Sequence, residues 1–311
     1  MRTCLLVLSL SFLAVQGPQI FAPSVISDAN EQWRLTFTPD GRTAYFAESE
    51  KFFPITRKAT IYTSTLEDGQ WSEPVVAPFS GTHSDIDPFI TPDGQRLYFS
   101  SIRPVPPDLK VGPTQSRDSG GVSRSDIDIW MVERTAQGWS EPIHLGPEVN
   151  SPDDELYPSA SADGTLYFAS GPQAPGAARH YDIYRARPAG QSFRAREVLS
   201  AAINTTPSPT DAGPQAAWEF NPEISADGTL LVFTSLRPGG QGLGDLYASR
   251  FVRGEWTRAE NLGLEVNTAA DEYHPTLSRD RKQLYFVRRG PSAGDFYSLP
   301  IASIPALSKG H

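Results

Sequence analysis

The chain has 311 residues, and its 36 acidic against 27 basic side chains give it a formal net charge of −9. A general nucleic-acid binder needs a basic surface to neutralise phosphates, so this charge excludes that class. Aromatic residues make up 11% of the chain, and 25 glycines with 28 prolines indicate frequent turns, which favours an all-β fold over a helical bundle.

The N-terminus predicts an exported protein. Arg2 is followed by about a dozen mostly apolar residues, a length typical of a signal peptide and short for a membrane span. We assign residues 1–17 to a signal peptide and expect a periplasmic or secreted protein with no membrane span after cleavage. A buried first strand or an uncleaved anchor remains the alternative. The single cysteine, Cys4, lies in this segment, so the rest of the chain has neither disulfides nor cysteine-ligated metals.

Five segments of the chain repeat one pattern, in which a short strand ends in a turn and a Tyr/Phe-rich strand follows. The turn contains an aspartate in every copy: Asp40, Asp93, Asp163, Asp227 and Asp280. Glycine follows this aspartate in four copies, and Asp-Gly between two β-rich runs predicts a hairpin. Arg281 replaces the glycine in the fifth copy, so we expect a different turn there.

Each repeat continues into a third strand, and four of them continue into a fourth, often after Gly-x-Trp. The last repeat stops after its third strand, and residues 21–26 occupy the register of its missing fourth strand. Radial packing of such four-stranded units buries both of their faces. The sequence therefore predicts a single five-bladed β-propeller over residues 20–302, closed by the N-terminal strand, with residues 303–311 as a C-terminal tail. Six blades are the alternative.

The repeat resembles that of the TolB-like, WD-repeat-like β-propellers of the bacterial envelope. Blade 4 carries the resemblance best, in Pro222, Ser225, Asp227-Gly228, Arg237-Pro238-Gly239-Gly240, Asp245-Leu246-Tyr247, Trp256 and Val266-Asn267. The family includes periplasmic partners of translocation systems and peptidoglycan-associated modules. The resemblance therefore implies a binding or scaffold module rather than one particular activity.

Two sets of residues at the start of the innermost strands are the candidate ligand-binding positions. The first set lies eight residues before each turn aspartate: Gln32, Asp85, Glu155, Glu219 and Glu272. The second lies six residues before it: Arg34, Asp87, Tyr157, Asn221 and His274. Residues two apart on a strand share a face, so we expect both sets to point toward the central channel. The uniform first set also suits a structural role, whereas the second set changes chemistry from blade to blade.

A hard cation is one ligand that this ring predicts. Oxygen ligands from Asp85, Asp87, Glu155 and Glu219, completed by His274 or water, would suit calcium. The run His83-x-Asp85-x-Asp87 adds to this pattern, with a solvated strand start as its alternative interpretation.

We expect a monomeric binding module that recognises a protein, a glycan or another small polar ligand of the envelope, without nucleic acid. Three loops, 102–125, 171–180 and 205–217, are expected to form a recognition rim. The alternative is a glycoside hydrolase in which Asp85 or Asp87 acts opposite Glu219. The Ser-x-Arg-Pro turns at Arg103 and Arg237 are expected to bond loop carbonyls.

Overall fold

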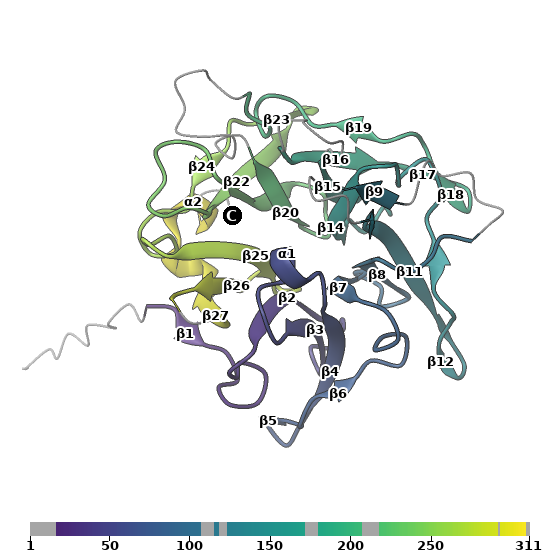
Figure 1. Cartoon of the computed structure of the whole chain (residues 1–311). Helices are drawn as coiled ribbons and strands as arrows, with labels where there is room; N and C mark the ends of the chain where they lie inside the picture. Colours follow the sequence, from purple (N-terminus) through teal and green to yellow (C-terminus); the bar gives the residue numbers. More distant parts are fainter. Residues whose placement is uncertain are drawn as a thin grey trace, which may run out of the picture.

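Five small antiparallel sheets form a closed ring (Figure 1), which confirms the five-bladed β-propeller. The computed structural model describes residues 17–106, 115–117, 123–171, 180–206, 218–291 and 293–308. The predicted signal peptide lies outside these residues except for Gly17, and so do most of the three predicted rim loops.

Each blade is a meander of four strands, from an inner strand at the hub to a short outer strand. Blade 1 contains β2 (Glu31–Phe37), β3 (Thr43–Ser49), β4 (Thr60–Glu67) and β6 (Val75–Val76), with β5 (Gln70–Trp71) in its hairpin. Blade 2 contains β7 (Asp85–Ile90), β8 (Arg96–Ser101), β11 (Asp128–Thr135) and β13 (Ile143–His144), with β12 (Gly138–Trp139). Blade 3 contains β14 (Asp154–Ala160), β15 (Leu166–Gly171), β16 (Asp182–Ala186) and β19 (Glu197–Val198).

Blade 4 contains β20 (Glu219–Ile224), β21 (Leu230–Ser235), β22 (Asp245–Val252) and β24 (Glu260–Asn261), with β23 (Glu255–Trp256). Blade 5 contains β25 (Asp271–Leu277), β26 (Gln283–Arg289) and β27 (Gly294–Pro300). Two further hairpins, β9 (Gln115–Arg117) with β10 (Ser123–Ser125) and β17 (Pro188–Ala189) with β18 (Ser192–Phe193), lie off the blade sheets.

The N-terminal strand β1 (Gln19–Ile20) completes blade 5 as predicted, although it lies just before residues 21–26, to which the prediction assigned the closing strand. Ile20 pairs with Tyr297 of β27 in the way that Asn261 pairs with Tyr247 in blade 4. The backbone N–H of Phe21 then donates to the carbonyl of Phe296 at 2.8 Å. Pairing the first strand with the last removes two open sheet edges and closes the ring.

The turn aspartates form the same local structure in all five blades, so the expectation of a different fifth turn was wrong. Thr38 Oγ1 donates to Asp40 Oδ1 at 2.6 Å in blade 1, and Ser278 Oγ donates to Asp280 Oδ1 at 2.7 Å in blade 5. Gly41 has φ +68°, and Arg281 takes the same left-handed conformation with φ +53°. The side-chain hydrogen bonds within the turn are therefore sufficient to hold an arginine where glycine is favoured.

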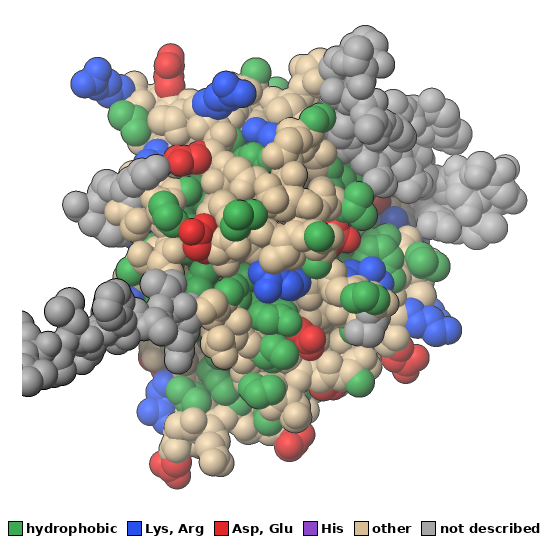
Figure 2. Space-filling view, turned by 90° about the vertical axis from the view of Figure 1, so that its left-hand side faces the viewer, with side chains coloured by type: hydrophobic (Ala, Val, Ile, Leu, Met, Phe, Trp, Pro, Cys, Tyr) green, Lys and Arg blue, Asp and Glu red, His purple; other side chains and the backbone are tan. Residues whose placement is uncertain are grey.

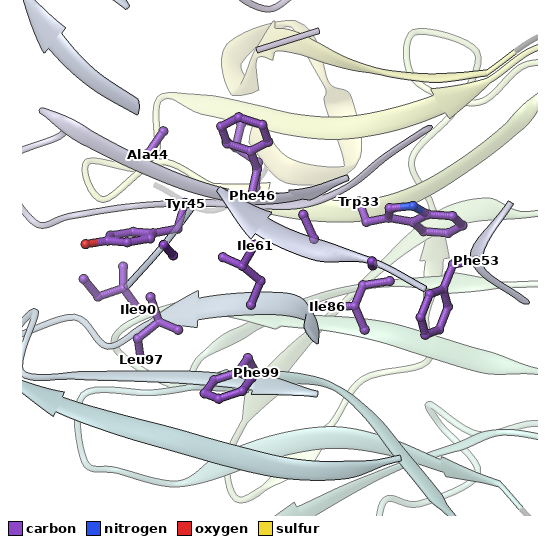
Figure 3. Close-up of a cluster of buried hydrophobic side chains, with 14 of the residues drawn as sticks. Trp33, Ala44, Tyr45, Phe46, Phe53, Ile61, Ile86, Ile90, Leu97 and Phe99 are labelled. Carbon is purple, nitrogen blue, oxygen red and sulfur yellow. The ribbon is translucent and has the colours of Figure 1, made fainter. Parts of the chain in front are cut away.

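Apolar side chains from neighbouring sheets pack between the blades, as Figure 3 shows for blades 1 and 2. Phe46 of β3, Ile61 of β4 and Phe99 of β8 are completely buried there. Burying a side chain of this size contributes about 1.5–3 kcal/mol relative to leaving it exposed. This interface fixes how the inner strands of adjacent blades approach each other, and so positions the hub.

The C-terminal residues pack on the outside of blades 4 and 5. After β27 the chain forms η1 (Ile301–Ser303) and α2 (Pro305–Ser308), and Leu307 is buried in the apolar cluster of these blades. On the face shown in Figure 2, acidic and basic side chains are scattered among apolar ones. None of the helices in the described ranges is long and apolar enough to cross a membrane.

Candidate functional site

The first predicted set of residues is engaged within the blades. In blade 2, Asp85 accepts hydrogen bonds from Ser101 Oγ at 2.6 Å and from Arg103 Nη2 at 2.6 Å. In blade 4, Glu219 accepts bonds from Ser235 Oγ at 2.7 Å and from Arg237 Nη2 at 3.2 Å. These carboxylates bond the inner strand to side chains on and just after the second strand. Their contacts therefore fit the structural role that was the alternative to ligand binding.

Blades 3 and 5 repeat this arrangement with other arginines. Glu155 contacts Arg196 Nη1 at 2.5 Å, and Glu272 contacts Arg288 Nε at 2.6 Å. Burial raises the pKa of Glu155 to about 8, although the charge of Arg196 acts against this rise. Arg103 and Arg237 also donate to the loop carbonyls of Phe79 and Ile203, which confirms the carbonyl contacts predicted for these turns.

A β-bulge in every inner strand separates the second set from the first. The register shifts at this point in all five blades, and four of the residues have positive φ: Asp87 (+58°), Tyr157 (+61°), Asn221 (+51°) and His274 (+51°). Each of these four precedes a proline. The prolines have no N–H to donate to the strand ladder, which suits them to the bulge. Because the bulge breaks the alternation of side chains, the two sets do not share one face as predicted.

The second set meets at the hub of the ring. Asn221 Nδ2 lies 3.1 Å from His274 Nδ1, and the same nitrogen of His274 lies 3.6 Å from Asp87 Oδ1. The ring of Tyr157 packs edge-on against that of His274 with 5.5 Å between centroids. These residues and Arg34 come from five different blades, so the structure brings the predicted variable positions together. Their role in ligand binding stays a prediction.

Burial controls the charges at the hub. Arg34, Asp87 and Asn221 are 0% exposed and His274 is 2% exposed, whereas Tyr157 is half-buried. Burial raises the pKa of Asp87 to about 7, against the effect of the Arg34 charge. Burial, helped by the charge of Arg34, holds the pKa of His274 well below its usual value. Neither carboxylate oxygen of Asp87 has a hydrogen-bond partner of good geometry in the described chain.

Both ends of the channel are covered by side chains of the protein itself. At the end where the inner strands begin, helix α1 (Phe53–Thr56) lies over the centre of the ring (Figure 1), and Phe53 packs on Trp33. Arg57, which follows the helix, forms a double hydrogen bond with Asp154 at 3.0 Å. At the other end, Arg279 Nη2 donates to the carbonyls of Ile90 and Thr91. The variable hub residues therefore lie between two covers.

A pocket opens beside α1, on the face where the inner strands begin. It has a volume of about 690 Å³ and lies on blade 1, next to the segment that leads into blade 2. Its lining is Asn30, Glu48, Ser49, Glu50, Lys51, Thr56, Lys58, Ala59, Thr60, Tyr62, His83 and Ser84. Of these residues only His83 was predicted, as part of the run His83-x-Asp85-x-Asp87. The position of Glu48 in the repeat, where blades 2 to 4 have serine, was a further visible signal.

The predicted calcium ligands do not fit a calcium site. Asp85, Glu155 and Glu219 are each bonded to an arginine, and a guanidinium competes with a cation for the same oxygens. Within the described ranges, no group of three or more His, Cys, Asp and Glu side chains could hold a metal ion.

The same contacts bear on the hydrolase alternative. A retaining or inverting glycosidase needs two carboxyl groups that are free to reach the scissile bond from opposite sides. Asp85 and Glu219 each accept bonds from a serine and an arginine of their own blade, and both are completely buried. The arrangement stabilises the blades and does not present this pair to a substrate.

Comparisons with known proteins agree with the fold. No protein-family model and no curated protein matches the sequence. Among solved structures, the chain is similar to an α-L-arabinofuranosidase from Lactobacillus brevis, with a TM-score of 0.54 and 13% identity over 90% of this chain and 93% of that one. It is also similar to a Hadza microbial sialidase, with a TM-score of 0.51 and 12% identity over 92% and 68% of the two chains.

A third similar structure is TolB from Acinetobacter baumannii, with a TM-score of 0.49 and 15% identity over 87% of this chain. The match covers 54% of that TolB, so the chain spans about half its length. At these identities the likeness concerns the propeller fold, which both binding proteins and enzymes use.

Proposed function

We propose that the protein is an exported binding module of the cell envelope that recognises a polar ligand on the face where the inner strands begin. The observation that carries this proposal is the pocket on blade 1, which opens beside α1 while the hub itself is covered. The ligand is a glycan, another small polar molecule or a segment of a partner protein. Binding pockets commonly lie on loops that a rigid scaffold positions.

The balance of charges supports a binding role over a catalytic one. Blades 2 to 5 neutralise their inner carboxylates with arginines of their own. The pocket instead presents Glu50, Lys51 and Lys58, none of which forms an ion pair with another described residue. Charged groups without internal partners on a concave surface are suited to an external polar ligand.

The experiment measures binding and turnover on one panel of probes. Soluble peptidoglycan fragments and envelope oligosaccharides are titrated calorimetrically into the purified mature chain, and the mixtures are analysed for cleavage products. We expect saturable binding without products. Thr60→Trp, which fills the pocket, should abolish this binding, whereas Val252→Trp at an exposed site on blade 4 should not.

Export is tested on the same protein. The full chain is expressed in a bacterial host, and the mass of the recovered protein is measured after cell fractionation. A shortened chain in the periplasm or medium supports the proposal, and a full-length cytoplasmic chain contradicts it. Product formation that survives Thr60→Trp would contradict the binding role.

A further inference from the structure

Four of the five blades place an arginine over an aromatic ring beside the inner acid. In blade 4, Arg237 Cζ lies 4.7 Å from the ring centroid of Tyr247 while its Nη2 contacts Glu219. The same stacking occurs in the other three blades: Arg103 on Trp130 at 5.4 Å, Arg196 on Tyr184 at 5.0 Å and Arg288 on Tyr297 at 4.9 Å. A guanidinium held between a carboxylate and a ring face is thus a repeated feature of this propeller.

Blade 1 keeps the aromatic ring of this feature. Tyr62 pairs with Phe46 across β3 and β4, with centroids 6.2 Å apart and planes at 25°. The equivalent pair in blade 4, Phe233 and Tyr247, has values of 6.3 Å and 28°. Within the described chain no guanidinium is stacked on Tyr62, which lines the pocket on blade 1.

The charged residues around the Tyr62 ring differ from those around the equivalent ring of blade 4. Where blade 4 has Glu219 paired with Ser235, blade 1 has Gln32 paired with Glu48. The residue two positions further along, which is Arg237 in blade 4, is Glu50 in blade 1. The sequence has therefore replaced the internal cation by a carboxylate and has added a second carboxylate opposite the inner strand.

Two acceptor groups at this site lack a partner, in one case a hydrogen-bond donor and in the other a cation, that an external ligand would supply. Gln32 is completely buried, its Nε2 donates to Asp28 at 2.8 Å, and its Oε1 has no hydrogen-bond partner among the described residues. Glu48 forms no ion pair with a described residue, and burial together with the charge of Asp28 raises its pKa to about 7. Lys51 and Lys58 also line the pocket, but neither forms an ion pair with Glu48 or Glu50 there.

We propose that the pocket on blade 1 binds the guanidinium group of an external ligand, stacked on Tyr62 and hydrogen-bonded to Glu48. The ligand then supplies the cation that blades 2 to 5 supply from their own chains. A planar guanidinium suits the ring better than a compact ammonium or a metal ion. This inference rests on the proposed function, because it names the ligand class of the same pocket. A free guanidine compound and an arginine side chain of a partner share this chemistry.

The experiment titrates four small probes into the full mature chain by calorimetry, at a pH about one unit above the Glu48 pKa. Agmatine and acetyl-arginine amide carry the guanidinium, acetyl-citrulline amide is its neutral counterpart, and calcium chloride is a simple cation. We expect the two guanidinium probes to bind and the other two not to bind. Stronger binding of agmatine than of acetyl-arginine amide identifies a free small molecule as the source, and the reverse order identifies an arginine side chain of a partner.

Variants locate the binding. Glu48→Gln should weaken binding of the guanidinium probes by roughly tenfold to a hundredfold, the range expected for one charge-assisted hydrogen bond. Glu67→Gln, an exposed acid of the same blade, is the matched control and should change nothing. Lys58→Ala should leave the affinity equal or higher, because it removes a competing positive charge.

A third variant copies blade 4 into blade 1. Gln32→Glu, Glu48→Ser and Glu50→Arg together should fill the pocket with an internal guanidinium, abolish binding and raise the melting temperature. The inference would be overturned if the citrulline probe bound as tightly as the guanidinium probes, or if calcium bound more tightly than they do. It would also be overturned if Lys58→Ala abolished binding, or if the folded wild-type chain bound no guanidinium probe. If Thr60→Trp still blocks binding of a neutral glycan in that case, the proposed function stands without it.

Discussion

Arg34 of blade 1 reaches across the hub to Glu223 of blade 4, and the guanidinium and carboxylate are 2.5 Å apart. Arg34 is 0% exposed and Glu223 is 4% exposed. Arg34 also donates to the carbonyl of Pro222 at 3.1 Å, and Glu223 accepts the N–H of Leu277. This ion pair links blades that are not neighbours in the ring.

Removing one partner of this pair should be costly. Arg34→Met leaves Glu223 buried without its counter-charge, and we expect the free energy of unfolding to fall by about 3–5 kcal/mol. The measurement is urea denaturation. The double variant Arg34→Met/Glu223→Gln should recover part of the loss, because the glutamine is neutral and still accepts the Leu277 N–H. A double variant less stable than Arg34→Met would contradict the role assigned to the pair.

Asp87 predicts a pH dependence of stability. Its pKa is raised from 3.8 to about 7 in the folded state, so the folded chain holds this proton more tightly than the unfolded chain does. The stability contributed by the protonated group is complete below pH 3.8 and is lost as the pH rises through about 7. We expect Asp87→Asn to reduce the decline of the melting temperature over this interval.

The other titrating groups do not obscure the comparison between wild type and Asp87→Asn. His274 has the opposite sign, because its lowered pKa costs stability only as the pH falls below its ordinary value of 6.5. Glu155 and Glu48 have raised pKa values like Asp87, but they are present in both proteins, so the difference between wild type and Asp87→Asn isolates one group. Parallel pH profiles for the two proteins would show that the pKa of Asp87 is the same in the folded and unfolded states, which contradicts the raised value.

Asn204 is expected to contribute strongly to the stability of blade 3. Its Oδ1 accepts the N–H of Ile183 at 2.8 Å, and its Nδ2 donates to the carbonyls of Ile183 and Leu199 at 3.0 Å. Asn204→Ala removes the partner of the Ile183 N–H and of the Leu199 carbonyl, at about 1–3 kcal/mol for each, whereas the Ile183 carbonyl still accepts the Leu199 N–H. Chemical denaturation should show a loss above about 2 kcal/mol. The exposed Gln95→Ala should stay within about 0.5 kcal/mol of wild type.

Closure of the ring by the N-terminus predicts a rescue experiment. A chain that begins at Asp28 lacks β1 and the completely buried Ile26, and it exposes the edge of β27. We expect a lower melting temperature and aggregation. A synthetic peptide of residues 18–27 should restore monodisperse protein, whereas the same peptide in scrambled order should not. Ile26→Ala in the intact chain should cost about 2–5 kcal/mol. Equal melting temperatures for the shortened and intact chains would exclude this closure.

The repeat pattern was sufficient to predict the architecture. The Asp-Gly turns and the spacing of the Tyr/Phe strands recur so regularly that blade number and strand order followed from them, while the closing strand was assigned to residues 21–26 instead of Gln19–Ile20. The fifth turn was misjudged because Arg281 adopts the left-handed conformation within the hydrogen bonds of Ser278 and Asp280. Glycine is favoured at such a position, and local contacts are able to replace it.

The site was harder to predict than the fold. Strand alternation predicted that Asp85 and Asp87 lie on one face. Because of the bulge before Pro88, Asp85 instead contacts Arg103 of its own blade and Asp87 lies near His274 at the hub. The proline that follows the variable residue in blades 2 to 5 was the available signal for that bulge. The placement of α1 over the channel depends on long-range contacts such as Arg57 with Asp154, which no local pattern reveals.

The pairing of β1 with β27 also determines when the ring can close during synthesis of the chain. The strand that completes the last blade is the first to emerge from the ribosome, and its partner appears almost a whole chain later. Until then the growing protein is an unclosed arc with two bare β edges, the state in which chains of this kind pair with copies of themselves. A chaperone that shields the emerging N-terminal segment therefore protects the assembly of every blade, including those that never touch it.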